Sequence, residues 1–381
     1  MYESGRGRFL VIAAGGTGGH MFPAQALSQE MLRRGWRVSL STDDRGLRYA
    51  GGFPPEVERR EVQSATFARG GIAEKMRAPF TILSGANEAI AWFKKEKPDL
   101  VAGFGGYPSL PALGAAWRLG LPRMIQEQNS VLGRVNALFA KRVHAVACGV
   151  EHISNAPLGA NLHFIGNPIR DAGRALSGSP YHPIDENGPI RLLVFGGSQG
   201  ARIFDERVPA AVAALPAEIR DRLLLTQQVR EADQNEVREG YRRAGVLAEL
   251  APFFDDMPQR IAGAHLVVCR AGASTIAELT AIGRPSVLAP YPAAMNDHQT
   301  HNAHGLVDAG AAVMLPDAAM SVERLTAQLT ELLNDPARLT KMAAAARGLG
   351  APNAASDLAD LAERVVQQLG QLGCQALHRH L

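Results

Sequence analysis

Cysteines, long apolar runs and paired acidic side chains are all scarce in this sequence of 381 residues. Its three cysteines, Cys148, Cys269 and Cys374, follow no metal-ligand spacing, which argues against both a disulfide framework and a zinc ribbon. The longest uncharged stretch of near-membrane length, residues 100–117, is interrupted by glycines and prolines and would form a poor membrane-spanning helix. No Asp-x-Asp motif is present, so a divalent cation lacks a usual pair of carboxylate ligands. We therefore expect neither a metal site nor a cofactor.

The composition is that of a globular protein whose charge is unevenly distributed. Hydrophobic residues make up 46% of the chain and charged residues 20%, which disfavours disorder and a coiled coil. Residues 1–168 carry 20 lysines and arginines against 13 acidic residues, whereas residues 169–381 carry 20 against 24. A basic first half predicts an anionic partner: a nucleic acid, a phosphorylated ligand or an acidic lipid surface. We expect no nucleic acid, because the sequence shows neither an aromatic-rich RNA-binding surface nor a recognised DNA-binding motif.

Short apolar runs alternate with helix-like patterns along the chain. The runs of the first half are Phe9–Ala14, Val38–Ser41, Leu100–Ala102, Arg123–Gln126 and Ala145–Cys148. Those of the second half are Ile190–Phe195, Leu223–Thr226, Leu266–Cys269, Ser286–Ala289 and Ala312–Leu315. This alternation predicts an α/β fold in which helices flank parallel sheets. The glycine-rich segments after the first run of each half begin 181 residues apart, which is about the length of one α/β domain.

We predict two similar domains from this repetition. Residues 171–189 contain three glycines and three prolines with little apolar periodicity, as expected for a linker. The predicted domains are residues 1–168 and 169–381, each a doubly wound, Rossmann-like parallel sheet, with a cleft between them. Apolar residues recur at helical spacing over residues 355–372, which predicts a C-terminal helix within the second domain.

The first glycine-rich segment, Gly15–His20, lies between a predicted strand and a predicted helix. Glycines let backbone N–H groups approach a ligand closely, and a helix N-terminus adds about half a positive charge. The spacing is neither a convincing dinucleotide fingerprint nor a P-loop. His20 directly follows the glycines. It can act there as a general base near neutral pH or serve only as a hydrogen-bonding residue at the helix start.

Two further loops repeat this arrangement. Gly196–Arg202 follows a predicted strand, and Ser198 within it can offer a hydroxyl to a phosphate or a sugar. Cys269–Glu278 places small residues at another helix N-terminus, which suits a diphosphate. Glu278 lies in the first turns of that helix and can accept hydrogen bonds from a ribose diol. Three such loops in a duplicated α/β chain indicate a nucleotide ligand.

A histidine-rich segment, residues 296–304, is the remaining candidate for a metal site. His298, His301 and His304 spread over about 120° of a helix at about 100° per residue, so they do not converge on one ion. We expect Asp297, His298 and Gln299 to contact sugar hydroxyls instead.

The basic half also contains apolar side chains interleaved with cations. These residues are Ile72, Lys75, Met76, Phe80, Leu83, Trp117 and Lys141. Such a mixture suits shallow insertion into an anionic leaflet, where each cation contributes about 1 kcal/mol. An ordinary amphipathic helix packed on the sheet would have the same pattern.

Taken in order, these motifs are similar to those of the MurG family of bacterial peptidoglycan glycosyltransferases. The matching segments are GGTGGH (Gly15–His20), GFGGYPSLP (Gly103–Pro111), QEQN (Gln126–Asn129), GNPIR (Gly166–Arg170), GGSQGAR (Gly196–Arg202), FFDDM (Phe253–Met257), CRAGASTIAE (Cys269–Glu278) and DHQTHNA (Asp297–Ala303). The resemblance covers almost the whole chain. It implies a GT-B fold, in which two Rossmann-like domains face a central cleft.

The resemblance also implies an activity and partners. Members of the family are inverting transferases that move N-acetylglucosamine from UDP-GlcNAc to the 4-hydroxyl of the muramyl sugar of lipid I. Lipid I is the undecaprenyl-diphosphate-linked muramyl-pentapeptide, and the products are lipid II and UDP. The expected location is peripheral, on the anionic cytoplasmic face of the inner membrane, and the expected process is peptidoglycan synthesis, with its consequences for cell shape and division.

Roles for individual residues follow from the resemblance alone. In the first domain, Thr17, Gly18, Gly19 and Asn129 would line the cleft, with the lipid I diphosphate at the glycine loop. The donor would be bound by Arg170, Ser198, Phe254, Ala273, Ser274, Thr275, Ile276, Ala277, Glu278, His298 and Gln299. Within this set the backbone at Phe254 would meet the uracil, Glu278 the ribose and Gln299 the sugar hydroxyls. His20 would be the catalytic base, and Glu127 is the second candidate.

Two positions depart from the family pattern. Gln126 stands where the family commonly has histidine, so this position has no role in proton transfer. Phe254 replaces a usual aliphatic residue, which matters little if the backbone makes the contact. A UDP-GlcNAc 2-epimerase and a non-catalytic nucleotide-sugar binding protein remain alternative functions.

Overall fold

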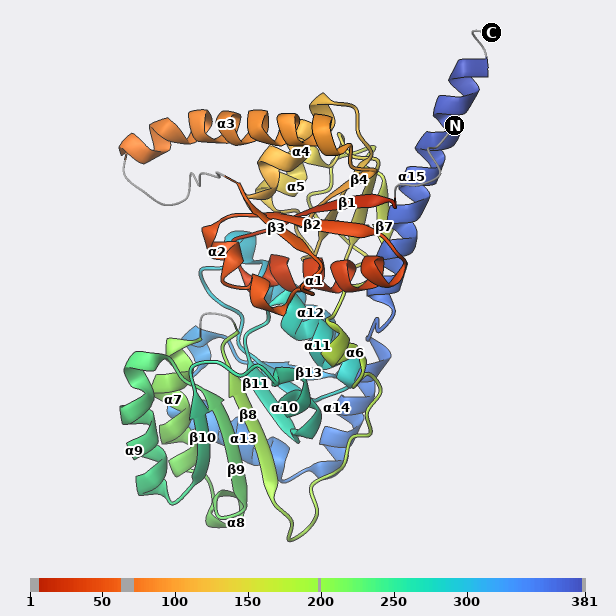
Figure 1. The fold of residues 1–381 in the computed structure, drawn as a ribbon. Coiled ribbons are helices and arrows are strands. Elements are labelled where there is room, and N and C mark those ends of the chain that lie inside the picture. The colour runs from red at the N-terminus through yellow and green to blue at the C-terminus, as the bar shows by residue number, and fades with distance from the viewer. Residues whose placement is uncertain (1–6, 63–71, 198–199, 379–381) are drawn as a thin grey trace. The chain divides into compact units, whose positions relative to one another are not determined.

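The computed structural model describes residues 7–62, 72–197 and 200–378, with the backbone alone for residues 72–80, 82 and 372–378. The chain forms two compact units (Figure 1). The first unit consists of residues 1–170 and 353–381, and the second of residues 171–352. Within the described part of the chain, no helix is both long and apolar enough to cross a lipid bilayer.

The first unit is built on a sheet of seven parallel strands. They are β1 (Phe9–Ala13), β2 (Arg37–Thr42), β3 (Glu58–Glu61), β4 (Leu100–Gly103), β5 (Arg123–Glu127), β6 (Ala145–Cys148) and β7 (Leu162–Phe164). Their spatial order is β3-β2-β1-β4-β5-β6-β7. The five buried strands coincide with the predicted apolar runs. The edge strands β3 and β7 were not predicted, because an exposed edge needs no apolar run, and β3 reads Glu-Arg-Arg-Glu.

Helices cover both faces of this sheet. They are α1 (Gly18–Arg33), α2 (Asp44–Leu47), α3 (Ile72–Glu96), α4 (Ser109–Arg118), α5 (Arg134–Phe139) and α15 (Ala354–His378), with the short 3-10 turn η1 (Ala50–Gly52). Leu10 and Ile12 face a core shared with α1 and α15, whereas Phe9 and Val11 face a core shared with α3, α4 and α5. This alternation follows from the two-residue period of a strand, in which successive side chains point to opposite faces.

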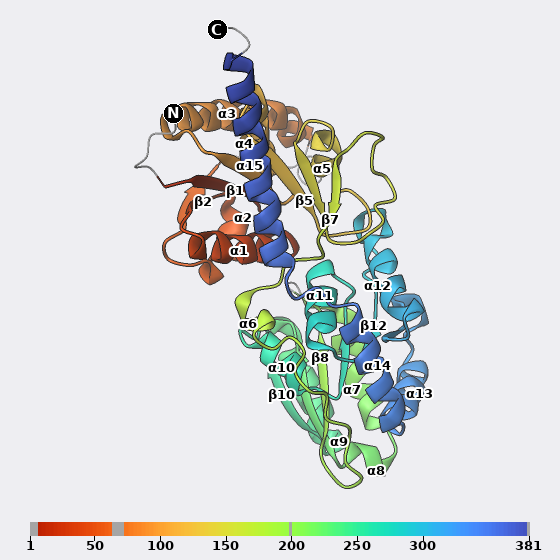
Figure 2. The same ribbon diagram turned by 90° about the vertical axis from the view of Figure 1, so that its right-hand side faces the viewer.

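Helix α15 packs in the first unit, whereas the sequence analysis expected it in the second domain. Helix α15 runs alongside the sheet of the first unit (Figure 2), and its Leu358, Leu361 and Val365 are buried in the same core as side chains of α1. Arg34, at the end of α1, forms an ion pair with Asp360 of α15 (2.6 Å). The physical reason is the winding of the sheet. Helices α4 and α5 cover β4 to β6 on one face. The other face of these strands, on the side of α1, is covered by α15.

The second unit repeats the architecture with six parallel strands. They are β8 (Ile190–Phe195), β9 (Leu223–Gln228), β10 (Leu247–Ala251), β11 (Leu266–Cys269), β12 (Ser286–Leu288) and β13 (Ala312–Met314), in the order β10-β9-β8-β11-β12-β13. The helices are α6 (Asp171–Arg174), α7 (Arg202–Ala213), α8 (Ala217–Arg220), α9 (Gln234–Ala244), α10 (Met257–Gly263), α11 (Ala273–Ile282), α12 (His298–Asp308), α13 (Val322–Leu333) and α14 (Pro336–Gly348). Three short 3-10 turns are η2 (Glu231–Asp233), η3 (Met295–Asp297) and η4 (Asp317–Ala319). Beyond α6, the predicted linker is irregular.

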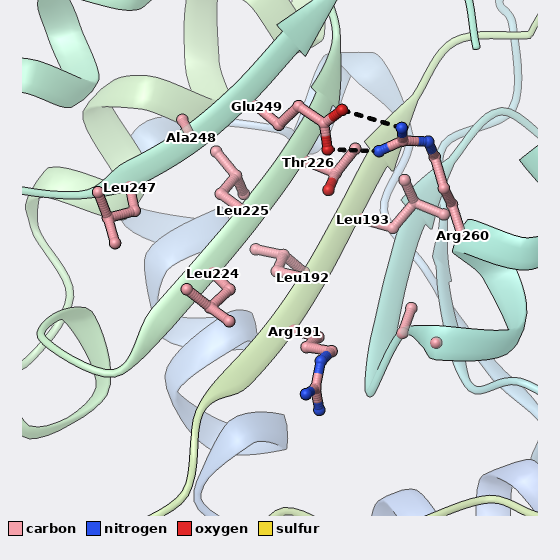
Figure 3. A pocket seen from close by; sticks show the side chains of 12 residues that line it. Arg191, Leu192, Leu193, Leu224, Leu225, Thr226, Leu247, Ala248, Glu249 and Arg260 are labelled. Carbon is pink, nitrogen blue, oxygen red and sulfur yellow. Dashed lines mark hydrogen bonds and ion pairs between the residues drawn. The ribbon is translucent and has the colours of Figure 1, made fainter. Parts of the chain in front are cut away.

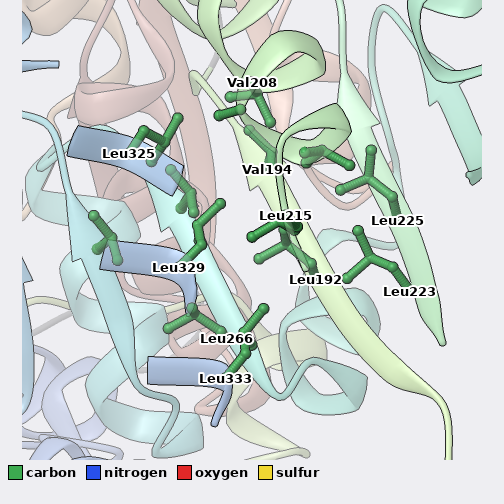
Figure 4. Packing of buried hydrophobic residues seen from close by; sticks show 14 of the residues in the cluster. Leu192, Val194, Val208, Leu215, Leu223, Leu225, Leu266, Leu325, Leu329 and Leu333 are labelled. Carbon is green, nitrogen blue, oxygen red and sulfur yellow. The ribbon is translucent and has the colours of Figure 1, made fainter. Parts of the chain in front are cut away.

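Apolar side chains again fill both faces of the sheet. Val194 and Leu266 pack with Val208 of α7 and Leu329 of α13 on one face (Figure 4). Helices α10, α11, α12 and α14 pack on the other face, around Phe195 and neighbouring residues. The predicted pair of doubly wound, Rossmann-like sheets is therefore confirmed.

Both sheets reverse their winding direction at one point. In the first unit this point lies between β1 and β4, and in the second between β8 and β11. Loops at the carboxyl ends of two such strands diverge to opposite faces and leave a crevice that binds ligands in α/β proteins. The predicted glycine loops follow β1, β8 and β11, and therefore lie at these two positions.

One stretch of the second sheet is incompletely covered. Helix α10 has only seven residues, and beside it Leu193, Leu224, Leu247 and Arg260 line a cavity of about 600 Å³ on the face of β8, β9 and β10 (Figure 3). Leu247 is 73% exposed. This cavity lies on the face of the sheet, whereas the glycine loops lie at the ends of the strands.

Candidate functional site

The glycine loop after β1 forms a tight turn at the start of α1. Gly16 has a φ of +88°, in the left-handed region that favours glycine. Gly15 is constrained by space, because a Cβ atom on it would lie 2.6 Å from Cγ of Pro108. Thr17 takes the N-cap position in extended conformation, and α1 begins at Gly18. The loop thus presents a helix N-terminus, which stabilises an anion, at the carboxyl edge of the sheet.

His20 lies in the first turn of α1, beside the exposed Gly19. Its Nδ1 atom is 3.0 Å from the carbonyl oxygen of Gly15. Gly105 and Gly106, in the loop after β4, pack against the same imidazole: Cβ atoms built on them would lie 3.2 Å from Nε2 and 3.4 Å from Nδ1 of His20. Both glycines have positive φ, +88° and +75°. The loops of β1 and β4 therefore meet at the imidazole of His20, at the point where the winding reverses.

The carboxylate of Glu127, the last residue of β5, is 2% exposed and holds the loop that follows it. Its Oε1 accepts hydrogen bonds from the backbone N–H and the side-chain amide of Asn129 (both 3.1 Å). Its Oε2 accepts from the backbone N–H of Gly133 (2.8 Å) and from Nδ2 of Asn136 (2.9 Å). A carboxylate has about four lone-pair positions, and these bonds use all four. This geometry suits Glu127 to organising the loop more than to accepting a proton from a substrate.

A buried amide network, which the sequence analysis did not identify, supports the same loop. Gln128 donates to the side-chain oxygen of Gln126 and to the carbonyl oxygen of Phe104. Gln126 also donates to Oδ1 of Asn167 (3.1 Å), whose own amide donates to the carbonyl oxygen of Gln128 (2.8 Å). The signal for this network was present in the sequence, because polar residues at the end of an apolar strand must find partners once buried.

Arg170 was expected to bind the donor together with residues of the second domain. It belongs to the first unit, where its guanidinium lies 4.2 Å from the ring centroid of Phe22 in α1. Phe22 is two residues beyond His20, so the stacking ties Arg170 to the helix that begins at the first glycine loop.

The second glycine loop also depends on its glycines. A Cβ atom on Gly196 would lie 2.3 Å from the backbone nitrogen of Ala201, so the turn closes on itself. Gly197 and Gly200 have φ values of +82° and +69°. Ser198 lies outside the described residues, and its expected contact with phosphate or sugar stays a prediction.

The third loop leads into α11, whose N-cap is Gly272. The first intrahelical bond of α11 runs from the backbone N–H of Ile276 to the carbonyl oxygen of Gly272 (3.0 Å). The preceding N–H groups therefore point out of the helix start, as the sequence predicted. Ala273 and Glu278 are buried, whereas Ser274, Thr275, Ile276 and Ala277 are partly exposed. Among the described residues, the hydroxyl oxygen of Ser274 is buried without a hydrogen-bond partner.

Two adjacent residues directly before α12 lie in the left-handed region. Asn296 and Asp297 have φ values of +53° and +52°, and non-glycine residues hold such values only where the surroundings impose them. The Nδ1 atom of His298 then lies 2.8 Å from the carbonyl oxygen of Met295. Within the described part of the chain, no group of three or more His, Cys, Asp or Glu residues is arranged to hold a metal ion.

Two side chains hold the segment after β12. Oε1 of Gln299 accepts a hydrogen bond from the backbone N–H of Tyr291 (2.9 Å). Arg270 is buried, donates to the carbonyl oxygens of Ala289 and Pro290, and forms an ion pair with Asp317. Sequence reasoning gave Arg270 no role, although an arginine that directly follows a buried strand is a signal for a buried, paired charge.

Phe254, the expected uracil contact, is buried against Arg260 of α10. The guanidinium of Arg260 lies 4.0 Å from the ring centroid of Phe254. The same group forms ion pairs with Glu249 and with Asp256 (2.7 Å). The ring therefore supports its own loop, and the expected contact of the Phe254 backbone with uracil stays a prediction.

Family models match both units. The glycosyltransferase family 28 N-terminal domain matches residues 10–148, and the glycosyltransferase family 28 C-terminal domain matches residues 191–365. The chain belongs to glycosyltransferase family 28.

Relatives within family 28 are similar over nearly the whole chain. The UDP-N-acetylglucosamine--N-acetylmuramyl-(pentapeptide) pyrophosphoryl-undecaprenol N-acetylglucosamine transferase of Chelativorans sp. (strain BNC1) is 46% identical over 94% of this chain and 96% of its own length. The protein of the same name from Phenylobacterium zucineum (strain HLK1) is 47% identical over 94% of this chain and 98% of its own length. The resemblance to the MurG family is thereby confirmed.

Solved structures agree with this placement in family 28. The crystal structure of Acinetobacter baumannii MurG matches with a TM-score of 0.75 and 30% identity, over 94% of this chain and 99% of that one. A Listeria monocytogenes protein provisionally described as a UDP-N-acetylglucosamine 2-epimerase matches with a TM-score of 0.64 and 16% identity, over 93% and 95%. The second likeness concerns the GT-B fold alone.

Three residues of the predicted membrane patch can be located in the structure. Leu83 of α3 and Trp117 of α4 are 60% and 52% exposed. Lys141 is exposed, and the guanidinium of Arg142 lies 5.6 Å from the ring centroid of Trp117. The side chains of Ile72, Lys75, Met76 and Phe80 lie outside the described residues. The patch stays a prediction.

Proposed function

We propose that this chain transfers N-acetylglucosamine from UDP-GlcNAc to the 4-hydroxyl of the muramyl sugar of lipid I, giving lipid II and UDP. The observation that carries the proposal is the 46–47% identity, over 94% of the chain, to transferases of this specificity. The two GT28 domains and the glycine loops at both winding reversals are consistent with it.

The second unit would bind the donor. The start of α11 would stabilise the diphosphate, and Glu278, in the second turn, would accept hydrogen bonds from the ribose. The Ser274 hydroxyl, buried without a partner among the described residues, supports this role because a phosphate oxygen would satisfy it. Gln299 and His298 would contact the sugar, and the backbone at Phe254 the uracil.

The first unit would bind the acceptor and supply the base. In an inverting displacement, the acceptor oxygen forms a bond to the anomeric carbon while the bond from this carbon to the diphosphate oxygen breaks. The acceptor proton passes to Nε2 of His20, and UDP leaves with the bonding electron pair. Helix N-termini stabilise the negative charge that develops on the leaving diphosphate. Glu127, whose carboxylate accepts four hydrogen bonds, would position the loop that carries Asn129.

The test is UDP release from UDP-GlcNAc, with and without a short-chain lipid I analogue, in the presence of EDTA. We expect release that depends on the acceptor and survives EDTA. Conversion of the sugar without acceptor would favour a UDP-GlcNAc 2-epimerase. Tight UDP-GlcNAc binding without turnover would favour a non-catalytic binding protein.

We also propose that the chain acts as a peripheral protein on the cytoplasmic face of the inner membrane. The exposed side chains of Leu83 and Trp117 support this, together with Arg142, which stacks on Trp117, and the exposed Lys141 next to it in sequence, because apolar and basic groups together favour an anionic leaflet. Co-sedimentation should occur with anionic vesicles and weaken for a variant with Leu83→Ser and Trp117→Ser. Equal binding to purely zwitterionic vesicles would contradict an electrostatic component.

A further inference from the structure

A single buried amide joins two segments of the second unit that are distant in sequence. Gln228, the last residue of β9, has a side chain that is 4% exposed. Its Oε1 accepts a hydrogen bond from the backbone N–H of Gly196 (3.1 Å). Its Nε2 donates to the carbonyl oxygen of Gly197 (2.9 Å) and to that of Pro252 (3.0 Å). All three partners are backbone atoms, so the amide fixes the path of two loops.

The first of these segments is the glycine loop after β8. The Gln228 amide accepts from the N–H of Gly196 and donates to the carbonyl oxygen of Gly197, so it holds the peptide groups on either side of these two glycines. The turn beyond them is too tight for a Cβ atom on Gly196, so it has little room to adjust. A displacement at Gly196 would therefore move the start of α7.

The second segment is the loop that contains Phe254. Arg260 anchors the far end of this loop, by stacking on Phe254 and pairing with Asp256 (2.7 Å). Gln228 anchors the near end, through the carbonyl oxygen of Pro252. The two anchors bracket the peptide units at Phe253 and Phe254.

We infer that Gln228 is a positioning residue that sets the distance between two loops of the donor site. One is the glycine loop that begins at Gly196, which would contact phosphate or sugar, and the other contains Phe254, whose backbone would contact the uracil. The inference rests on the proposed function, because it assigns these two loops to one nucleotide. The reason is chemical: only a side chain with one acceptor and two donors at this reach satisfies Gly196, Gly197 and Pro252 together. Leucine satisfies none of them, and glutamate would place a carboxylate oxygen against two carbonyl oxygens.

The test compares Gln228→Leu with the unmodified chain in calorimetric titrations with UDP and with uridine. We expect the Kd for UDP to rise about tenfold, because the three hydrogen bonds that orient the two loops would be lost. We expect the Kd for uridine, which engages only one loop, to rise less than threefold. In steady-state assays the KM for UDP-GlcNAc should rise while kcat stays within about threefold.

The matched control is Gln227→Leu. Gln227 is the neighbouring buried glutamine of β9, and its side chain points to the opposite face of the sheet, where Tyr241 donates a hydrogen bond to it. This variant should lose a comparable amount of thermal stability but keep the UDP affinity of the unmodified chain. A UDP Kd for Gln228→Leu within twofold of the unmodified chain would overturn the inference. An equal loss of affinity in Gln227→Leu would overturn it as well, since destabilisation alone would then explain both.

The two proposals fail in different ways. If the unmodified chain binds no UDP, the proposed function fails before Gln228 is tested. If the unmodified chain binds UDP and transfers the sugar, and Gln228→Leu does both equally well, only the positioning role fails.

Discussion

The Nδ1 atom of His20 and the carbonyl oxygen of Gly15 lie 3.0 Å apart. A carbonyl oxygen only accepts hydrogen bonds, so Nδ1 is the protonated nitrogen of the neutral imidazole and Nε2 carries the lone pair. The glycine loop that would bind an anion therefore also selects the tautomer that the proposed role of His20 as a base requires. In the proposed function, this contact would link substrate binding and proton transfer within five residues of chain.

The first prediction concerns His20 itself. His20→Ala should lower kcat on the order of 10²–10⁴-fold, because a positioned general base contributes about this much. The Kd for UDP should stay unchanged, since the residue lies in the unit that would bind the acceptor. Steady-state kinetics with both substrates varied distinguish a general-base role from a binding role. A loss confined to the KM of the acceptor would instead assign His20 to binding.

A second prediction uses the glycine that packs against the imidazole. Gly105→Ala would place a Cβ atom 3.2 Å from Nε2 of His20, so we expect kcat to fall at least about tenfold as the ring is displaced. Gly120→Ala is the matched control, because Gly120 also has a positive φ (+68°) but a Cβ atom there would have nothing within 4 Å. Both variants should lose about 1–3 kcal/mol of stability from backbone strain. Equal kcat values for the two would contradict the proposed contact.

The third prediction separates two roles for Glu127. In Glu127→Gln, an NH2 group would replace one of the two carboxylate oxygens. It would then face N–H donors that now donate to that oxygen, either those of Gly133 and Asn136 or the two of Asn129. Each buried donor left without an acceptor costs about 1–3 kcal/mol. We expect a lower melting temperature and a raised KM for the acceptor. Glu151→Gln, at an exposed position of the same unit, should change neither. A pure kcat loss at unchanged stability would make Glu127 the base.

The fourth prediction concerns acid stability. His265 is 6% exposed, its Nδ1 accepts a hydrogen bond from the backbone N–H of Arg191 (3.0 Å), and burial lowers its pKa to about 4 from an ordinary 6.5. The folded state thus favours the neutral ring, so its contribution is present above pH 6.5 and is lost as the pH falls towards 4. At about 1.4 kcal/mol per pKa unit, the loss is about 3 kcal/mol.

Urea unfolding of the chain and of His265→Asn at pH 7 and pH 4.5 measures this contribution. Asparagine keeps a hydrogen-bond acceptor and removes the titration, so the variant should lose less stability than the unmodified chain on acidification. Parallel losses in the two proteins would show that His265 does not titrate with a lowered pKa.

Much of the fold was predictable because buried parallel strands leave a strong local signal. The runs 145–148, 190–195 and 266–269 coincide with the strands β6, β8 and β11, since a strand buried on both faces is apolar at nearly every position. The edge strands β3, β7 and β10 were missed, because an exposed edge strand needs no continuous apolar run. The helical period of residues 355–372 was read correctly, but periodicity does not tell which sheet a helix covers.

The candidate site divides in the same way. Glycine loops at His20, at Gly196 and at Ala273 could be found from sequence, because positive φ values and close backbone packing favour a residue type that is visible in the chain. The partners of Glu127 and Gln228 could not, since backbone and amide groups leave no sequence pattern: those of Glu127 lie in the segment that folds back after β5, and those of Gln228 lie in two separate loops.

The sequence by itself determined the family, the duplicated α/β architecture and the positions of the glycine loops, because each depends on local residue patterns. Only the tertiary structure decided that α15 completes the first unit, that Glu127 is saturated with hydrogen bonds, and that Gln228 joins two loops. These depend on which buried polar groups and apolar faces meet. That is settled by how the chain packs, because bare sheet faces need a cover and most buried donors find an acceptor, within one segment for Glu127 and between distant segments for α15 and Gln228.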